Sequence, residues 1–387
     1  MRDLERESLP LNFRKLDIAA RRAALEAAYG EKGLELGALG EAELGLVDGM
    51  VESALGCLSL PFGLATGFLI DGRAYDVPMA TEEASVIAAA TFGARLVAAA
   101  GGFSTWASEP VMRAQVFLEG ALPGAELEIE RREAELRAGL EPLLASLGRR
   151  GGGYRGLALC RNEETGLLRV DLRIDVRDAM GANILDAAAE RAASELEAMS
   201  GGRRLMCILS NDASERRAGA SCRIPVGRLA RASFSGEEAA RRMVLASRAA
   251  ETDPSRAVTH NKGVMNGVSA LALATGNDFR AIEAAAHFWA CRDGRYRGIS
   301  GFRLVDGGLE GWIELPLVFG SVGGAIGAQA ATALALRLLR KPDGRGLSRI
   351  AAALGLAQNF AALFALVTEG IQAGHMKLHA RKREAGA

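Results

Sequence analysis

Aromatic residues make up only 5% of this 387-residue chain, and neither sign of charge prevails, since 47 Lys and Arg face 47 Asp and Glu. Binding to nucleic acid needs a basic surface, and single strands also need aromatic rings on which bases stack. The balanced charge gives no attraction to an anionic membrane either. We therefore expect neither nucleic acid nor a membrane surface as a partner.

Metal-binding and disulfide patterns are also lacking. The five cysteines are odd in number, scattered and without a C-x-x-C pair, and the four histidines show no metal-site spacing. This pattern is typical of reduced thiols in a cytosolic compartment. The first ten residues, MRDLERESLP, contain no apolar run, so we expect no signal peptide. The predicted location is the cytoplasm, and no metal is predicted.

Two uncharged runs, Leu315–Leu336 and Ile350–Thr368, are long enough to cross a membrane. Alanine and glycine dominate both runs, and amide side chains interrupt them at Gln329, Gln358 and Asn359. We predict loops and buried helices of a large core rather than membrane spans.

The common nucleotide and hydrolase motifs are absent: the sequence has no Walker A, H-E-x-x-H or G-x-S-x-G pattern. Gly151, Gly153 and Gly156 do match G-x-G-x-x-G. That fingerprint requires a strand before it and a helix after it. Here the periodicity predicts a helix before and a strand after, which excludes a dinucleotide fingerprint at this position.

The rhythm of apolar residues divides the chain. Helical spacing dominates residues 1–60 and 216–369, with strand pairs expected around the turns Asp71–Gly72 and Asp306–Gly308. Residues 110–215 instead read strand, helix, strand, strand, helix, strand, the order of a ferredoxin-like βαββαβ unit. We predict an α+β fold: a mostly helical large domain (1–109 and 216–369), an inserted small domain (110–215) and a tail (370–387).

One stretch, RAVTHNKGVMNGVSALALATGND at 256–278, combines an ammonium and a carboxylate with an apolar run. Lys262 draws notice because the chain has only six lysines against 41 arginines. Lys can act as a compact point charge and change its protonation state, whereas Arg cannot. The alternative is a structural ion pair of Lys262 with Asp278.

Two further stretches are candidates for chemistry. DVRDAMGAN at 175–183 passes from a strand into a helix through a glycine, so helix N-terminal amides could receive a pyrophosphate. In the alternative, Asp178 is the N-cap of that helix. Glu82 and Glu83 lie at an expected helix start, where the dipole favours carboxylates, and a structural role is the alternative there too.

Taken together, these stretches resemble the bacterial (class II) 3-hydroxy-3-methylglutaryl-coenzyme A reductase family. The matching motifs are DVRDAMGAN, ILSN, RAxTHNKGxMNG, ATGND, GLAQN, TEGIQxGHMxLHAR and EExSxxAAA, in family order along nearly the whole chain. The resemblance implies a split large domain, an inserted nicotinamide-binding small domain and an intertwined homodimer with active sites at the subunit interface. It also implies NADH or NADPH as cofactor and an acyl-CoA substrate.

By this resemblance Lys262, Glu83, Asp278 and His375 are the catalytic residues of a four-electron reduction of hydroxymethylglutaryl-CoA to mevalonate, or of its reverse. Lys262 would stabilise the oxyanion, and Asp278 would keep Lys262 charged. Glu83 would protonate mevaldehyde, and His375 the departing CoA thiolate. The substrate positions implied by the resemblance are Arg256, Ser85, Asn211, Thr259, Asn266 and Gln358. The cofactor positions implied are Asp178, Met180, Gly181, Asn183 and Asn162.

The sequence departs from the family pattern in four places. The family's ENVIG is Glu52–Gly56 (ESALG) here, and its T-K-T-H-P segment is replaced at Ile326–Ala330. Only Met376–Ala387 follow His375, so we expect a shortened C-terminal flap and weaker exclusion of water. Asn162 stands where an acidic residue usually holds the adenosine ribose, beside Arg161, which could bind a 2′-phosphate. The choice between NADH and NADPH therefore stays open.

Two other functions fit the same motifs. A diverged oxidoreductase of the same fold could act on another acyl-CoA, which the altered segments favour. A non-catalytic protein that binds CoA or a nucleotide could have kept the scaffold, although the presence of all four catalytic residue types disfavours it.

Overall fold

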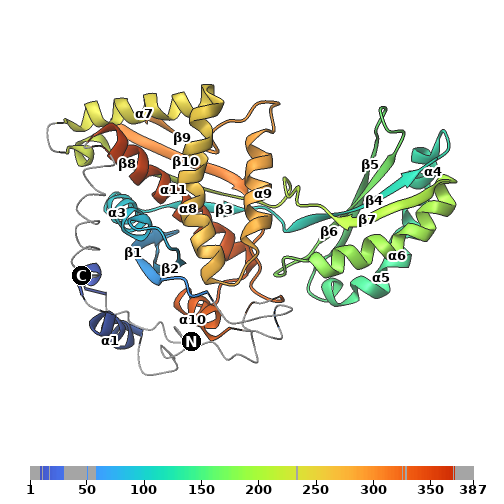
Figure 1. Ribbon diagram of the computed structural model, residues 1–387, viewed down its shortest axis with the longest axis horizontal. Coiled ribbons are helices and arrows are strands. Elements are labelled where there is room, and N and C mark those ends of the chain that lie inside the picture. The colour runs from blue at the N-terminus through green and yellow to red at the C-terminus, as the bar shows by residue number, and fades with distance from the viewer. Residues whose placement is uncertain are drawn as a thin grey trace.

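The structure is a computed structural model that describes residues 9–10, 12–16, 18–29, 50, 58–231, 234–324, 326, 329–368 and 370. Figure 1 shows two bodies side by side: a large body, and a small body formed by the central stretch of the chain. Helices and antiparallel sheets occur together, so the predicted α+β class is confirmed.

Two antiparallel sheets belong to the large body. One is a hairpin whose turn residues Asp71 and Gly72 have φ of 48° and 75°, which a tight two-residue turn requires. A similar turn at Asp306–Gly307 joins two strands of the second sheet, so both predicted hairpins are confirmed. The hairpin strands are β1 (Phe62–Ile70) and β2 (Arg73–Ala80), and the second sheet runs in the order β3 (Ser104–Ala107), β8 (Arg217–Pro225), β10 (Gly308–Pro316), β9 (Ser300–Val305).

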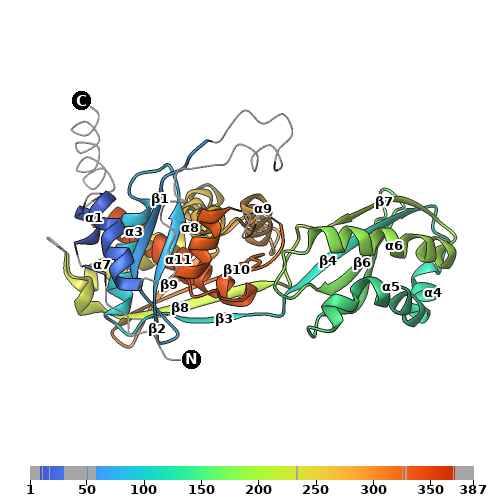
Figure 2. The ribbon, with the colours of Figure 1, turned by 90° about the horizontal axis from the view of Figure 1, so that it is seen from below.

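Helices pack against the inner face of the second sheet, which lies along one side of the large body (Figure 2). The helices in contact with this sheet are α3 (Val86–Ala98), α7 (Gly236–Thr252), α9 (Phe279–Ala290) and α11 (Gly344–Val367). Helix α8 (Pro254–Ala274) packs on α11 and β2, α10 (Ala330–Leu338) packs on β2 and α8, and α1 (Ile18–Tyr29) packs on apolar residues of β1 and α10. The 3-10 turns η1 (Phe13–Lys15) and η3 (Val226–Leu229) belong to the same body.

The core is built around α11, which is buried along most of its length. Small residues let neighbouring helices come close to it. A Cβ on Gly93 of α3 would lie 2.3 Å from the Ala357 carbonyl oxygen, and one on Gly267 of α8 would lie 3.1 Å from the Leu354 side chain. By length and hydropathy α11 could cross a membrane, but 83% of its most apolar window is buried inside the protein. It therefore has the character predicted for a buried core helix.

The small body is a four-stranded antiparallel sheet with helices on one face (Figure 2). Its strand order is β5-β6-β4-β7, and alternate residues of β4 and β6 are buried against the helices. Its elements are β4 (Val111–Glu119), α4 (Ala125–Arg131), α5 (Glu133–Gly148), β5 (Gly153–Arg161), β6 (Leu168–Asp175), α6 (Ala182–Ser200) and β7 (Arg203–Leu209).

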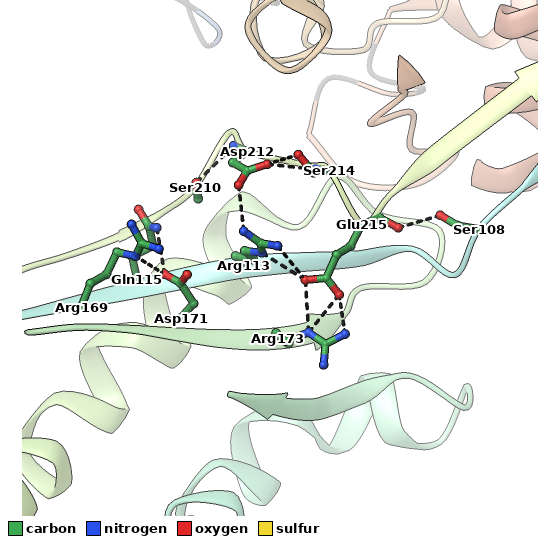
Figure 3. A network of polar contacts seen from close by, with 10 residues as sticks. All are labelled: Ser108, Arg113, Gln115, Arg169, Asp171, Arg173, Ser210, Asp212, Ser214 and Glu215. Atoms are coloured by element: carbon green, nitrogen blue, oxygen red, sulfur yellow. Dashed lines mark hydrogen bonds and ion pairs between the residues drawn. The ribbon is translucent and has the colours of Figure 1, made fainter. Parts of the chain in front are cut away.

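An ion-pair network fastens the base of the small body to the segment that returns to the large body (Figure 3). Glu215, in that segment, accepts hydrogen bonds from Arg113 of β4 and from Arg173 of β6. Arg113 also binds Asp212 at 2.8 Å, and the Ser108 hydroxyl donates to the Glu215 carbonyl at 2.7 Å. Bidentate contacts of this kind fix direction as well as distance.

Candidate active site

Helix α8 carries most of the predicted substrate side. Asp253 caps its N-terminus by accepting from the Ser255 amide, and Pro254 occupies the first turn, where its missing N–H costs nothing. At 100° per residue, the predicted site residues on α8 lie within an arc of about 120° on one face. These residues are Arg256, Thr259, Lys262 and Asn266.

Lys262 meets Glu83 at the surface of this face. The Lys262 Nζ lies 2.9 Å from Glu83 Oε2, and the two side chains are 59% and 43% exposed. Glu83 lies in the turn that leads into α3, three residues before the helix begins. The predicted helix start therefore falls later than Glu82–Glu83, because Ser85 occupies the N-cap position. The structural Lys262–Asp278 pair is also excluded, because the ammonium binds Glu83.

Asp278 lies elsewhere in the same chain. It caps α9, where its carboxylate accepts from the Arg280 and Ala281 amides at 3.0 and 3.2 Å and pairs with the Arg280 guanidinium at 3.1 Å. The twelve residues of α8 between Lys262 and Ala274 already span about 18 Å. The expectation that Asp278 contacts Lys262 is therefore wrong within one chain. His375 and the Glu52–Gly56 segment lie outside the described residues.

Two of the predicted substrate residues each have a buried polar atom without a hydrogen-bond partner among the described residues: the Ser85 hydroxyl and Gln358 Oε1. Ser85 also has φ of +79°, a left-handed conformation that is strained for a residue with a Cβ. Gln358 lies on α11 against Gly267 of α8, where an added Cβ would be 3.4 Å from the Gln358 Cβ. Unpaired buried polar groups in a strained setting are typical of sites that wait for a ligand.

His260, in the centre of the same motif, is a structural residue that the sequence did not distinguish. It is 1% exposed, and its Nε2 lies 2.7 Å from the Ser300 hydroxyl and 3.2 Å from the Ser300 carbonyl. Burial, together with the nearby Arg256 charge, lowers the pKa of His260 to about 4, against a small opposing effect of the Ser300 carbonyl. A neutral His260 thus anchors the buried side of α8 and holds Lys262 outward.

The DVRDAMGAN stretch forms a strand–loop–helix passage, as predicted. Gly181 is the N-cap of α6 with φ of +99°, and an added Cβ would lie 2.6 Å from the Val176 side chain. Only glycine fits there, and the first α6 amides have no side-chain cap, so they are free to face an anion. The alternative of Asp178 as N-cap is wrong: its Oδ1 accepts from the Gly344 amide of α11 at 3.2 Å. Met180 is half-buried, and Asn183 is exposed in the first turn of α6.

Asn162 lies far from that loop. It follows the end of β5 that pairs with Leu168, whereas the loop follows Asp175 at the other end of β6, about 23 Å away at 3.3 Å per residue. Its side chain accepts from the Thr165 amide at 2.9 Å in a tight turn. Arg161 is bound to Glu126 at 2.6 Å in the free protein. The structure does not unite Asn162 with the other cofactor residues.

Asn211 is exposed in the segment that returns from the small body to the large one, next in the chain to Asp212, which pairs with Arg113. The structure thus brings Lys262 to Glu83, two residues before Ser85, and sets the 178–181 loop at the boundary between the two bodies.

Comparison with known proteins identifies one family. A family model described as hydroxymethylglutaryl-coenzyme A reductase matches residues 17–380. The chain is similar to the 3-hydroxy-3-methylglutaryl-coenzyme A reductase of Archaeoglobus fulgidus, with 43% identity over 347 residues that cover 87% of this chain and 77% of the relative. The probable reductase of Borreliella burgdorferi is 36% identical over 333 residues, which cover 86% of this chain and 77% of the relative.

Among solved structures, the chain is similar to the class II 3-hydroxy-3-methylglutaryl-CoA reductase from Streptococcus pneumoniae bound to NADPH in open conformations. The TM-score is 0.90 at 39% identity, covering 92% of this chain and 99% of that one.

Proposed function

This chain belongs to the hydroxymethylglutaryl-coenzyme A reductase family, and from that membership we propose how its residues share the reduction of hydroxymethylglutaryl-CoA to mevalonate and CoA. The observation that carries the proposal is the Lys262–Glu83 contact of 2.9 Å beside the unpaired Ser85 hydroxyl. An ammonium and a carboxyl group in contact, next to an unused donor, suit a carbonyl oxygen that first becomes negative and then takes up a proton.

Each side chain then has a separate task. Lys262 stabilises the oxyanion that forms at the thioester carbonyl. Glu83 gives a proton to the aldehyde oxygen in the second reduction, and His375 gives one to the CoA thiolate. The nicotinamide, when bound, supplies the hydride for each of the two reductions. Lys262 and Glu83 are in contact, so one proton can pass between them without solvent.

Substrate binding is assigned to groups around this pair. The Arg256 guanidinium is suited to the free carboxylate of the acyl group. The Ser85 hydroxyl and the Gln358 amide, both unpaired, donate to or accept from the acyl chain. Asn211, Thr259 and Asn266 supply further neutral hydrogen bonds.

The cofactor is assigned to the loop before α6, and the residues present fit it. The uncapped amides at the start of α6 suit a pyrophosphate, and Gly181 supplies the positive φ and the close packing against Val176 that the turn before them requires. Met180 and Asn183 flank that position, and Asp178 anchors the loop. Both NADH and NADPH are carried forward as cofactors, because the contacts of Arg161 and Asn162 remove the reason to favour a 2′-phosphate at that turn.

The small body is proposed to be a ferredoxin-like nicotinamide-binding domain (110–215) inserted into the large domain (1–109 and 216–369). Its strand order β5-β6-β4-β7 supports this. In this order β6 lies between β4 and β5, and β7 lies on the other side of β4, as in a ferredoxin-like βαββαβ unit. The balanced charge and the burial of α11 inside the protein support a cytoplasmic location.

We further propose a homodimer in which Asp278 of one subunit serves Lys262 of the other. Two observations support it: Lys262 is 59% exposed, and within one chain Lys262 pairs with Glu83 while Asp278 pairs with Arg280. A two-fold axis exchanges the same pair of residues twice and so completes two sites.

Complementation tests this arrangement. The Lys262→Ala and Asp278→Ala variants are each expected to be inactive, whereas a mixture that is dissociated and reassociated regains about one quarter of wild-type activity, from one complete site in each mixed dimer. Lys262→Ala mixed with Glu83→Ala is the matched control, because both residues lie in one site of one chain. Recovery in that control, or none in the test pair, contradicts the shared site.

The reaction itself is tested by following NADH and NADPH absorbance separately with hydroxymethylglutaryl-CoA. Consumption of two cofactor molecules per thioester, with release of free CoA, is the expected result. Faster turnover of another 3-hydroxyacyl thioester would favour the diverged oxidoreductase. Binding of CoA with no cofactor oxidation by any thioester would favour the non-catalytic alternative.

A further inference from the structure

A short segment of the large body, Phe319–Val322, lies directly against the cofactor loop. The Ser321 and Val322 amides donate to the Asp178 carbonyl at 2.8 and 3.3 Å, and Val322 pairs with Ala179 in a parallel bridge. Gly320 is packed so tightly that an added Cβ would lie 2.9 Å from the Met180 amide nitrogen. The cofactor loop is therefore joined to the large body through its backbone, independently of the strands that connect the two bodies.

Arg216 ties the two segments together from the buried side. It is 4% exposed, its Nη1 donates to the Ala179 carbonyl at 3.0 Å, and its Nη2 donates to the Phe319 carbonyl. Burial lowers the pKa of Arg216 to about 10, while the charges of Asp175 and Asp178 act in the opposite direction. Burying a cation is costly unless hydrogen bonds replace its lost hydration. Here the two carbonyls that replace it come one from each body, so Arg216 holds the two segments in a fixed register.

The same segment is joined on its other side to the residue before Asp278. The Gly320 amide donates to Asn277 Oδ1 at 2.7 Å, and Asn277, 8% exposed, holds its own amide against the Thr275 hydroxyl at 3.0 Å. A continuous chain of hydrogen bonds thus runs from the cofactor loop through Phe319–Val322 to the start of α9, where Asp278 is fixed.

We propose that Arg216 and Asn277 are positioning residues that clamp Phe319–Val322 between the cofactor loop and Asp278, and so set the distance between the bound nicotinamide and the catalytic carboxylate. This inference rests on the proposed function, because it presumes the cofactor at Gly181 and catalysis at Asp278. Neither residue touches the reacting atoms. They act through a segment that is shared by both sites.

The consequence is a selective loss in the hydride step. Hydride transfer depends steeply on approach distance, and a displacement of about 1 Å costs roughly a hundredfold. Breaking either end of the clamp therefore lowers kcat by about ten- to a hundredfold, with little change in the KM of the thioester, whose assigned contacts lie on α3, α8 and α11. The primary isotope effect with cofactor deuterated at C4 rises as hydride transfer becomes slower than product release.

The test uses Arg216→Met, Asn277→Ala and the double variant in the full-length protein. Arg223→Met is the control: Arg223 lies on β8, the strand that begins directly after Arg216, and like Arg216 it donates to two carbonyls, those of Val305 and Asp306 in the β9–β10 turn. If both residues hold one segment, the double variant loses no more kcat than the worse single variant, because a clamp broken at one end no longer fixes the register. Arg216→Lys, which keeps one donor, is expected to fall between wild type and Arg216→Met.

Hydrogen–deuterium exchange gives a readout that does not need turnover. Amides of residues 178–181 and 319–322 are expected to exchange at least tenfold faster in Arg216→Met and Asn277→Ala, and at the wild-type rate in Arg223→Met. Additive losses of kcat, an unchanged isotope effect, or unchanged exchange in folded variants would overturn the clamp. Accelerated exchange in a protein that shows no thioester reduction would leave the clamp standing and overturn the proposed reaction instead.

Discussion

Ser85 offers a sharp test, because its contribution to stability and its contribution to binding are expected to have opposite signs. Its left-handed backbone costs on the order of 1–2 kcal/mol, and a buried hydroxyl without a partner costs about 1–3 kcal/mol. Ser85→Gly removes both costs and adds roughly 0.5–1 kcal/mol of chain entropy. We expect a net gain of about 1–4 kcal/mol, or several degrees in Tm. Ser85→Ala removes only the unpaired hydroxyl and gains less.

Binding is expected to move the other way. Without the hydroxyl, the substrate loses one hydrogen bond of about 1–1.5 kcal/mol, so its KM rises about tenfold in both variants. Thermal unfolding with and without substrate, together with steady-state kinetics, measures both effects on the same samples. Lower stability in both variants would show that the hydroxyl already has a partner in the free protein. An unchanged KM would show that the hydroxyl makes no hydrogen bond to the substrate, and either result would refute the reasoning.

Three further predictions concern charged groups. Lys262→Ala should lower kcat at least about 10²–10³-fold, as expected for loss of an oxyanion donor. Its Tm should change little, because an exposed ion pair contributes under about 1 kcal/mol, and a large fall in Tm in a thermal scan would mean that Lys262 stabilises the fold instead. His260 keeps a pKa of about 4 against an ordinary value of 6.5, so the unfolded chain binds more protons than the folded protein between those pH values. The free energy of unfolding therefore falls by about 3 kcal/mol as the pH drops from 6.5 to 4. Denaturant unfolding of His260→Asn should lack this part of the pH dependence, and an equal dependence in both proteins would contradict a neutral His260. Burial alone would raise the pKa of Glu215, but hydrogen bonds from Arg173 and Arg113 outweigh it and lower the pKa. The ionised carboxylate therefore stabilises the fold above pH 4.5, and this contribution is lost as the pH falls below that value. In denaturant titrations Glu215→Gln should lower the free energy of unfolding by about 2 kcal/mol at neutral pH and by less near pH 3, whereas a pH-independent loss would mean that packing, not charge, is lost.

Patterns within one helix were the part of the site that the sequence predicted best. Arg256, Thr259, Lys262 and Asn266 follow helical spacing, so their common face could be derived before any coordinates. The Asp71–Gly72 turn and the glycine before α6 were equally legible, because positive φ leaves few choices of residue.

Errors arose where the partner of a side chain lies far away in the sequence. Asp178 binds the Gly344 amide, 166 positions later, and Lys262 binds Glu83, 179 positions earlier. Local rules proposed the nearest plausible partner, an N-cap for Asp178 and Asp278 for Lys262, and tertiary packing selected another. Asn162 lies apart from the loop before α6 for a related reason: the antiparallel pairing of β5 and β6 leaves it about 23 Å away, so its contact with the adenosine ribose stays a prediction.

The composition of α11 explains why hydropathy alone pointed toward a membrane. A helix contacted by α3, α7 and α8 and by the β3-β8-β10-β9 sheet must be apolar on nearly all sides, as a membrane helix is. Its side chains must also be small at these contacts, because Gly93 of α3 and Gly267 of α8 bring the backbones of those helices close to α11. Larger residues on α11 would separate α3 and α8 from it. The alanine and glycine content that imitates a membrane span is therefore what lets the helices that carry Lys262 and lead in from Glu83 pack around one core.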